Sequence, residues 1–279
     1  MLGPLVATSS LHIVLAVISV LMILPFLWMV LTSFKTLDQM SDPHWLPAGG
    51  WSAVWRIARS NYLTVFQQIP FARFYWNSVF VAAWTTFLQV LSSAMAAFCF
   101  ARLKWPGRDR VFLLYLSTMM LPALVMMIPN YLIMIDLHLL DTFAGLILPA
   151  SFGAFGTFLL RQFMLTIPSS LDEAAEIDGA GKWRLFWDII LPLSRPGLIT
   201  LAIFTFMANY NSFFWPLITL KSVEKYTLPV GLLYFDSTRG QTTHLLMAAT
   251  TMSILPMVVI FVLLQRYLVS GIQLGAVKG

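Results

Sequence analysis

The chain has few charged residues: Asp, Glu, Lys and Arg make up 10% of its 279 residues, against about 25% in an ordinary soluble domain. It has one cysteine, Cys99, which excludes an internal disulfide and a four-cysteine metal site. Hydrophobic residues make up 59% of the sequence. These features predict an integral membrane protein, with Cys99 as a buried thiol inside an apolar run. The net charge of +5 then indicates Lys and Arg at cytoplasmic membrane edges, and no nucleic-acid partner.

Motifs of enzymes and of self-powered carriers are also missing. The only approach to an ATP-binding P-loop is Gly181-Lys182, where Glu176 replaces the first glycine and Trp183 replaces Ser or Thr. The four histidines show no metal-ligand spacing, and no Gly-x-Ser-x-Gly elbow is present. We therefore expect no catalytic residues, no bound cofactor and no metal in this chain.

Six uncharged stretches are long enough to cross a bilayer as helices, which takes about 20 mostly apolar residues. They are 11–34, 77–101, 111–135, 142–160, 197–220 and 245–265. The first has no preceding Lys or Arg and no cleavage site, which favours an anchor over a signal peptide. We expect an all-α integral membrane protein with one transmembrane domain over 1–279. Close helix packing is expected at small residues four apart, namely Ser92/Ala96, Ser93/Ala97 and Ala249/Ser253.

The distribution of Lys and Arg predicts the orientation. The short loop 102–110 holds four of them, whereas loop 136–141 holds none and carries two Asp. Short basic loops stay on the cytoplasmic side. Both termini and the loop 161–196 are therefore expected to be cytoplasmic.

The loop 161–196 contains a charged segment with the pattern of two short helices. Ser170 and Glu173 fit a capping box at the start of the first helix, and Gly179 or Gly181 is expected to end it. The face expected to be buried holds Leu171, Ala174 and Ala175. A second helix should run to Pro192 with an apolar stripe of Trp183, Phe186, Trp187, Ile190 and Leu191. Such a hairpin either docks onto a partner protein or lies on the lipid surface.

The spacing of this segment resembles the EAA loop of ABC-importer permeases. That pattern is met by Glu173-Ala174-Ala175, Gly179, Ile189 and Leu191-Pro192. The resemblance implies that the loop is a coupling helix seated in a cleft of a cytoplasmic ATPase subunit, with Glu173 paired to a basic residue there. On this reading the coupling residues are Glu173, Ala174, Ala175, Asp178, Gly179, Ile189, Leu191 and Pro192.

Further segments are similar to the carbohydrate-importer branch, and more narrowly to maltose-type (MalG-like) permease subunits. They are Arg161-Gln162-Phe163, Tyr226–Gly231, Gln265-Arg266-Tyr267 and the tail Gly275-Ala276-Val277-Lys278-Gly279. The resemblance implies a type I importer (MetI-like) fold in a bacterial inner membrane. It also implies a second related permease subunit, two ATPase subunits that bind ATP and Mg, and an external solute-binding protein. In relatives the tail enters the interface between the ATPase subunits; otherwise it would be read as a frayed end.

Polar residues inside the apolar stretches mark either helix contacts or a solute path. Asn209, Tyr210 and Asn211 lie near the middle of the fifth stretch beside several aromatics, and amides with rings suit sugars. Asn130 follows two prolines that predict a kink, and Gln89 is a further candidate. In the maltose-type family the partner permease holds most of the solute.

The cargo stays open between a sugar and another solute such as glycerol phosphate, a polyol or an acidic oligosaccharide. From a different class, a stand-alone channel or secondary carrier is the alternative. Such a protein usually carries an ionisable residue at membrane depth, and none of the six stretches contains Asp, Glu, Lys or Arg. Transport energised from outside the membrane domain is therefore favoured.

Overall fold

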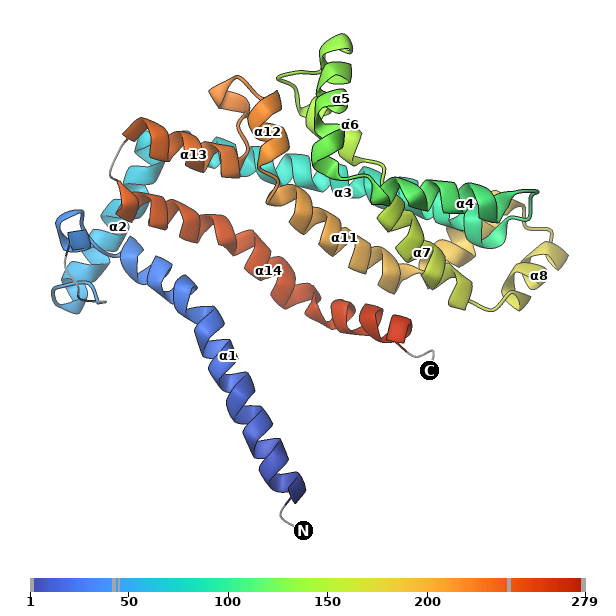
Figure 1. The fold of residues 1–279 in the computed structure, drawn as a ribbon, viewed down its shortest axis with the longest axis horizontal. Coiled ribbons are helices and arrows are strands. Elements are labelled where there is room, and N and C mark those ends of the chain that lie inside the picture. The colour runs from blue at the N-terminus through green and yellow to red at the C-terminus, as the bar shows by residue number, and fades with distance from the viewer. Residues whose placement is uncertain (1–2, 42–43, 45, 240–241, 277–279) are drawn as a thin grey trace. The chain divides into compact units, whose positions relative to one another are not determined.

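The computed structural model describes residues 3–41, 44, 46–239 and 242–276, and these form helices and no strand (Figure 1). The helices are α1 Gly3–Ser33, α2 Trp51–Gln68, α3 Phe71–Arg102, α4 Arg108–Ser117, α5 Ala123–Asp136, α6 Phe143–Ala150, α7 Ala154–Thr166, α8 Ser170–Ile177, α9 Lys182–Arg184, α10 Leu191–Leu193, α11 Arg195–Tyr210, α12 Phe214–Thr219, α13 Leu228–Arg239 and α14 Thr243–Ala276. Short 3-10 turns are η1 Asp38–Ser41, η2 Thr118–Met120 and η4 Val223–Lys225, and η3 Leu185–Ile190 is π-helical. The expected all-α class is confirmed.

The chain divides into two compact units, of which the first is Met1–Ala72 with Gly231–Leu255. In this unit α1 is apolar on all sides, and its residues 11–28 are exposed, as in a helix whose neighbours are lipid or another chain. The end of α1 is held by α2, because Asn61 Nδ2 donates to Ser33 O at 2.8 Å and to Lys35 O at 2.9 Å. A buried amide thus satisfies two carbonyls that the end of the helix leaves open.

The second unit is Arg73–Val230 with Pro256–Gly279. Its main core joins α3, α7, α8, η3 and α11, and includes Ala94, Ala97, Phe98, Leu160, Met164, Ala175, Leu185, Phe186, Ile190 and Leu201. The helices approach closely where side chains are small. A Cβ added to Gly156 would lie 2.5 Å from Ser93 Oγ, and one added to Gly197 would lie 2.7 Å from the Phe163 ring. Ser93 and Ala97 are buried, so one of the expected small-residue contacts is confirmed on α3.

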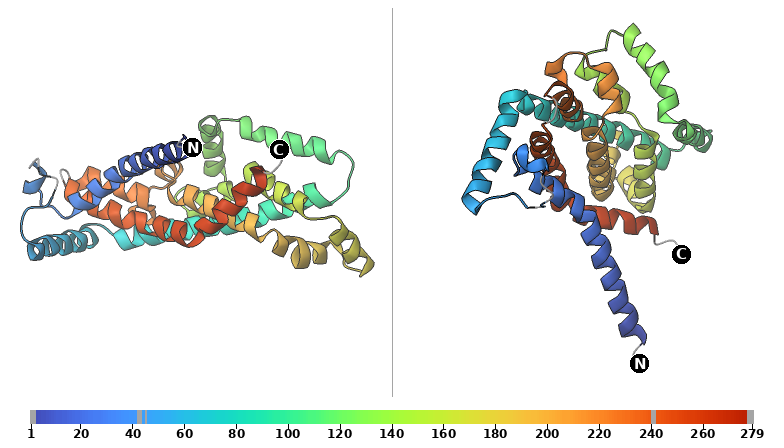
Figure 2. Two further views of the ribbon diagram at one scale, coloured as in Figure 1. Left: turned by 90° about the horizontal axis from the view of Figure 1, so that it is seen from below. Right: turned by 60° about the vertical axis from the view of Figure 1, so that its left-hand side comes forward.

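Three of the described helices are long and apolar enough to cross a membrane singly: Leu11–Ser33, Phe71–Arg102 and Thr243–Gln265. Three bent pairs raise the number to six if each pair is one span. These are Arg108–Met120 with Ala123–Asp136 at 97°, Phe143–Ala150 with Ala154–Thr166 at 44°, and Lys182–Leu193 with Arg195–Tyr210 at 75°. Figure 2 shows the same helices from two further directions. Six spans agree with the sequence, but three are broken and not straight.

The breaks correct several predicted boundaries. The stretch 111–135 is interrupted at Leu121–Pro122, where the proline cannot donate a helical hydrogen bond. The stretch 197–220 is not one helix, because α11 ends at Tyr210 and α12 starts at Phe214. At its other end α11 begins at Arg195, after a bend of 75° that separates it from Lys182–Leu193.

The predicted burial of Cys99 is wrong, since its side chain is exposed on α3. An apolar run predicts apolar surroundings, but it does not distinguish the protein interior from the lipid-facing surface. The lengths of two helices also differ from the prediction. α3 begins at Phe71 and α14 continues to Ala276, beyond the uncharged stretches from which they were predicted.

Gly197→Val should destabilise the second unit, because the new side chain would overlap the Phe163 ring that packs against α11. Overpacking of this kind costs about 1–3 kcal/mol, which should lower the thermal midpoint of the detergent-solubilised chain by several degrees. Gly50→Ala is the matched control, since a Cβ there meets nothing within 4 Å. Equal midpoints for the two variants would contradict the close contact.

Candidate functional site

The charged loop forms two helical segments joined at a glycine. α8 ends at Ile177, and Gly179 follows with φ +75°, a left-handed conformation that glycine adopts without strain. The predicted glycine stop is therefore confirmed at Gly179. The predicted capping box is wrong, because the N-cap is Ser169 and its side chain accepts no capping hydrogen bond.

The motif residues of α8 face outward. Glu173, Ala174, Asp178 and Gly179 are exposed, whereas Ala175 is buried. Burial of Leu171 and Ala174 was also predicted, but both are exposed. A two-turn helix at the edge of the core turns few of its positions inward, so α8 presents most of its surface to a partner.

The motif residues of the second segment face the core. Ile189 and Leu191 pack against the main cluster, while Pro192 is exposed and lies within the helical run, which continues to Leu193. Because Leu185–Ile190 is a π-helix, its inward positions differ from those of an α-helix. Within η3 the buried side chains are Leu185, Phe186 and Ile190. The predicted stripe members Trp183 and Trp187 are exposed.

Arg102 holds this loop to the end of α7, and Arg161 joins α7 to α3 beside it. Arg102 Nη1 lies 3.1 Å from Asp172 Oδ2, and its Nη2 donates to Met164 O at 2.5 Å and Ile167 O at 2.7 Å. Arg161 Nε donates to Phe100 O at 3.2 Å. Sequence reasoning used the basic loop at 102–110 for orientation only and missed Arg102 as a structural contact.

The guanidinium of Arg161 also lies over an aromatic ring. Its Cζ is 4.3 Å from the centroid of the Phe112 ring in α4, a cation–π geometry. Arg161 thereby joins α7, the end of α3 and α4. It belongs to the Arg161-Gln162-Phe163 segment noted in the sequence, where nothing indicated these contacts.

An exposed ion pair bridges the glycine turn. Lys182 donates to Glu176 Oε1. This hydrogen bond, together with the charge of Lys182, holds the pKa of Glu176 below its usual range. Surface pairs of this kind contribute little to stability. The turn is therefore set mainly by Gly179 and by the core contacts on either side.

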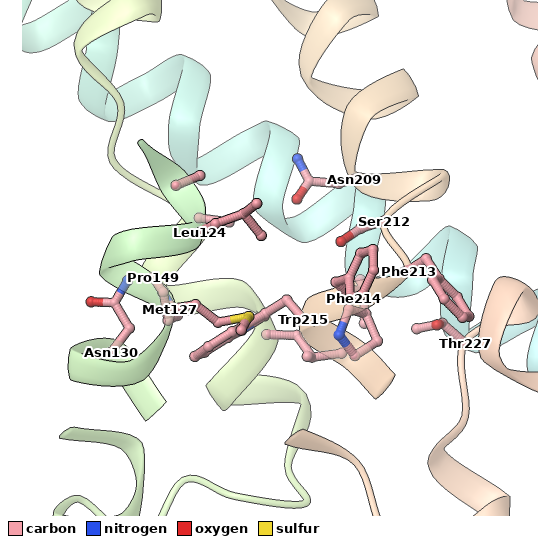
Figure 3. Close-up of a pocket in the computed structure, with 15 residues that line it drawn as sticks. Leu124, Met127, Asn130, Pro149, Asn209, Ser212, Phe213, Phe214, Trp215 and Thr227 are labelled. Carbon is pink, nitrogen blue, oxygen red and sulfur yellow. The ribbon is translucent and has the colours of Figure 1, made fainter. Parts of the chain in front are cut away.

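A pocket of about 470 Å³ lies among α5, α6, α11 and α12 (Figure 3). Figure 1 shows α5, α6 and α12 far from α8. The lining residues are Val81, Ala123, Leu124, Met127, Asn130, Leu146, Pro149, Ala150, Asn209, Ser212, Phe213, Phe214, Trp215, Pro216 and Thr227, with no Asp, Glu, Lys, Arg or His among them. An uncharged, aromatic-walled pocket with a few amides and hydroxyls suits an uncharged polar ligand.

The structure divides the predicted path residues. Asn130 and Asn209 line the pocket. Figure 3 places the Asn130 amide on the far side of Met127 from Asn209. Asn209 Nδ2 donates to Thr205 O at 2.8 Å within its own helix.

The other three candidates lie outside the pocket lining. Tyr210 is buried, and Asn211 is exposed, with its Nδ2 donating to Met207 O at 3.0 Å. Gln89 packs against Gly153, where an added Cβ would lie 2.7 Å from Gln89 Nε2. Ser212 lines the pocket beside Asn209 and was missed as a path residue.

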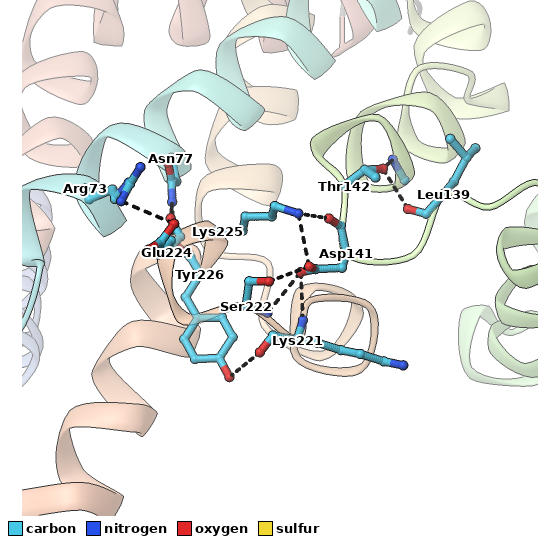
Figure 4. Close-up of polar contacts among 11 residues, drawn as sticks. Arg73, Asn77, Leu139, Asp141, Thr142, Lys221, Ser222, Glu224, Lys225 and Tyr226 are labelled. Carbon is cyan, nitrogen blue, oxygen red and sulfur yellow. Dashed lines mark hydrogen bonds and ion pairs between the residues drawn. The ribbon is translucent and has the colours of Figure 1, made fainter.

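Polar contacts tie the chain together near this pocket (Figure 4). Asp141 Oδ1 accepts from the backbone N–H groups of Lys221 and Ser222, and Oδ2 accepts from Ser222 Oγ and Lys225 Nζ. Burial alone would raise the pKa of Asp141, but these hydrogen bonds outweigh it and hold the pKa well below its usual range. We call this set of contacts, with Asp141 at its centre, the Asp141 clasp.

Asn77 and Ser78 connect the same region to α3. Asn77 Nδ2 donates to Glu224 O at 2.9 Å and Tyr226 O at 3.0 Å, and Leu228 N donates to Ser78 Oγ at 2.7 Å. The segment Tyr226–Gly231, noted in the sequence, therefore starts from a fixed contact with α3.

The predicted tail interface is described only in part. Gly275 and Ala276 lie in the last turn of α14, while Val277, Lys278 and Gly279 lie outside the described residues.

A model of the family described as "Binding-protein-dependent transport system inner membrane component" matches residues 89–274. The chain belongs to this family. Most of the second unit, with the loop and nearly all of the pocket lining, falls within the match.

Relatives and a solved structure agree with this assignment. The chain is 33% identical to the arabinooligosaccharides transport system permease protein AraQ of Halalkalibacterium halodurans, over 95% of this chain and 94% of the relative. It is 36% identical to the sn-glycerol-3-phosphate transport system permease protein UgpE of Yersinia pestis, over 79% and 78% respectively. A chain of a bacterial ABC transporter involved in the import of the acidic polysaccharide alginate has the same fold, with a TM-score of 0.83 and 22% identity over 96% of this chain and 98% of that one.

These matches confirm the expected resemblance to ABC-importer permeases and the type I (MetI-like) fold. As an inner membrane component, the chain is a multi-pass transport permease subunit.

Asp141→Asn should destabilise the protein at neutral pH, because the ionised carboxylate is the form that the clasp stabilises. A group with a lowered folded-state pKa contributes stability above its unfolded-state pKa, about 4 for Asp, and loses it as the pH falls through the folded-state value. The thermal midpoint of the variant should lie a few degrees below that of the native protein at pH 7, and the gap should shrink below about pH 4. Asp136→Asn, an exposed carboxylate near the same loop, is the control. A gap that does not change with pH would contradict the clasp.

Proposed function

We propose that this chain is the permease subunit of an ABC importer that carries an oligosaccharide or related polyhydroxylated solute into the cell. The observation that carries the proposal is the loop 173–192, whose motif residues split into an exposed face and a core-packed face. Glu173 is exposed on α8, while Ile189 and Leu191 pack into the core that also holds α3, α7 and α11. A coupling element needs an exposed surface that receives force from a partner and a packed connection that passes this force to the membrane helices.

The partners follow from the same loop. α8 docks into a cleft on one of two cytoplasmic ATPase subunits, which bind ATP and Mg, and Glu173 pairs with a basic residue there. The tail Gly275–Gly279 reaches the interface between these subunits, so both termini are cytoplasmic. A second, related permease subunit completes the membrane part, and an external solute-binding protein delivers the solute. The exposed apolar surface of α1 supports contact with lipid or with that second subunit.

The mechanism is alternating access without covalent chemistry in this chain. Closure of the ATPase pair displaces α8. The core around Phe186 and Ile190 passes this displacement to α3, α7 and α11. Helix breaks at Leu121–Pro122 and after Tyr210 border the pocket, where the backbone can change direction as the path opens to either side.

The pocket is where this chain contacts the solute. Asn209 and Ser212 offer hydrogen bonds to hydroxyl groups, and Phe213, Phe214 and Trp215 offer faces for the apolar side of a sugar ring. The AraQ relative, with a name that concerns arabinooligosaccharides, supports this substrate class.

Glycerol phosphate is the second candidate, because the UgpE relative is named for it. A phosphate is normally bound by Arg, Lys or backbone N–H groups at a helix N-terminus. The pocket lining has no Arg, Lys or His, which favours the uncharged solute for this subunit.

Glu173→Arg and Gly179→Val should each abolish uptake in cells that express the whole transporter, while membrane insertion stays intact. Arg at 173 would repel the basic partner of Glu173, and Val at 179 is strained at φ +75°. Uptake from an oligosaccharide panel and immunoblots of membranes measure the two effects. Asp38→Arg makes a comparable charge reversal at an exposed site outside the loop and should transport normally. Normal uptake by both loop variants would refute the coupling role.

Asn209→Leu should raise the solute concentration for half-maximal uptake about two- to tenfold, since one hydrogen bond to a hydroxyl is worth about 0.5–1.5 kcal/mol. Asn211→Leu is the matched control, because Asn211 is exposed and outside the pocket lining. Dose–response curves for uptake by reconstituted transporter distinguish the two. Equal curves for Asn209→Leu and native protein would exclude Asn209 from the solute path.

A further inference from the structure

One buried arginine, Arg102, connects three elements of the second unit, namely α3, α7 and α8. Arg102 is the last residue of α3, and its guanidinium binds Asp172 in the first turn of α8. The same group binds Met164 O and Ile167 O, two carbonyls at the end of α7. Met164 O also accepts from Ile167 N at 3.3 Å. The last carbonyls of a helix lack their usual intrahelical donors, so Arg102 supplies donors at the end of α7.

This ion pair joins a buried arginine to a largely buried aspartate. The Arg102 and Asp172 side chains are 6% and 19% exposed. Burying charges is costly, and an apolar replacement of such a pair is often as stable as the pair itself. Stability alone therefore does not account for a charged contact at this place.

The pair leaves bonding capacity unused. Arg102 Nε and Asp172 Oδ1 are buried and have no hydrogen-bond partner among the residues that the structure describes. A bidentate arginine–carboxylate pair would use two parallel bonds, whereas here Nη1 alone bonds to Oδ2. The spare donor and acceptor would allow a second bond between the same two side chains, so the link between α8 and α3 is kept when α8 is displaced.

Asp172 stands directly before Glu173, and the two carboxylates differ in environment. Asp172 is directed to Arg102 inside the protein, whereas Glu173 is exposed. The other ion pair described for α8, Glu176 with Lys182, is more than half exposed on both sides and leads only to α9. The Arg102–Asp172 pair is thus the ion pair, among those described for α8, that reaches a spanning helix.

We propose that Arg102 is a positioning residue that transmits the displacement of α8 to α3 and α7. It acts through its ion pair with Asp172 and its hydrogen bonds to the end of α7. This inference rests on the proposed docking of α8 to an ATPase subunit. Arg102 then provides the polar part of the transmission, and the contacts of the core provide the apolar part.

The test uses the complete transporter in proteoliposomes, with ATP hydrolysis and solute uptake measured in the same vesicles. Asp172→Asn keeps the shape of the side chain but removes its charge. Arg102→Lys keeps the charge but cannot hold the carboxylate and both carbonyls together. For each variant the number of solute molecules imported per ATP should fall about tenfold, while ATP hydrolysis stays within about twofold of native.

Glu224→Gln is the control, because it removes an exposed ion pair, with Arg73, that lies outside the loop and should leave the import ratio unchanged. An unchanged ratio for Asp172→Asn and Arg102→Lys would overturn the proposal. So would a joint loss of assembly, hydrolysis and uptake in both variants, since that pattern belongs to a purely structural residue. If Glu173→Arg also transports normally, the docking of α8 itself fails. If Glu173→Arg abolishes uptake while the Arg102 and Asp172 variants couple normally, only the role of Arg102 fails.

Discussion

The fold depends on hydrogen-bond donors for the carbonyl groups at the ends of helices. In apolar surroundings no water is present to donate to these carbonyls. Long helices supply these donors to the ends of other elements. Asn61 of α2 serves the end of α1, Arg102 of α3 serves the end of α7, and Asn77 of α3 serves the segment before α13. The break between α6 and α7 is served in the same way, because Ser92 Oγ of α3 donates to Ser151 O at 2.7 Å.

The same constraint separates two kinds of region in the second unit. In the region next to α8, Arg102 and Arg161 bind carbonyls and join α3, α4, α7 and α8 through close polar contacts. Around the pocket the spans are broken by Pro122 and after Tyr210, and the lining is mostly apolar. The region around Arg102 and Arg161 is thus built to move as a rigid body. The region around the pocket is built from short helices that can change position.

Much of the loop could be predicted from the sequence, because its signals are local. The left-handed turn at Gly179 and the helices on either side follow from residue types and spacing. The π-helix at Leu185–Ile190 could not, since an α-helical period was assumed, and the burial of Leu185, which lies outside the predicted stripe, was therefore missed. Arg102 was also missed as a contact, because its partners lie about 60–70 positions away in the chain and only folding brings them together.

Under the proposed function energy enters at α8, and the pocket itself is lined by uncharged residues. A carrier driven by an ion gradient needs an ionisable group near its solute path, and the pocket lining has none. Force must then reach the pocket mechanically, through side chains packed too tightly to deform gradually. The small residues that bring α3, α7 and α11 together make such a body. Under the proposed function, a displacement at α8 is passed on as a movement of whole helices, and the breaks beside the pocket are where that movement is converted into opening.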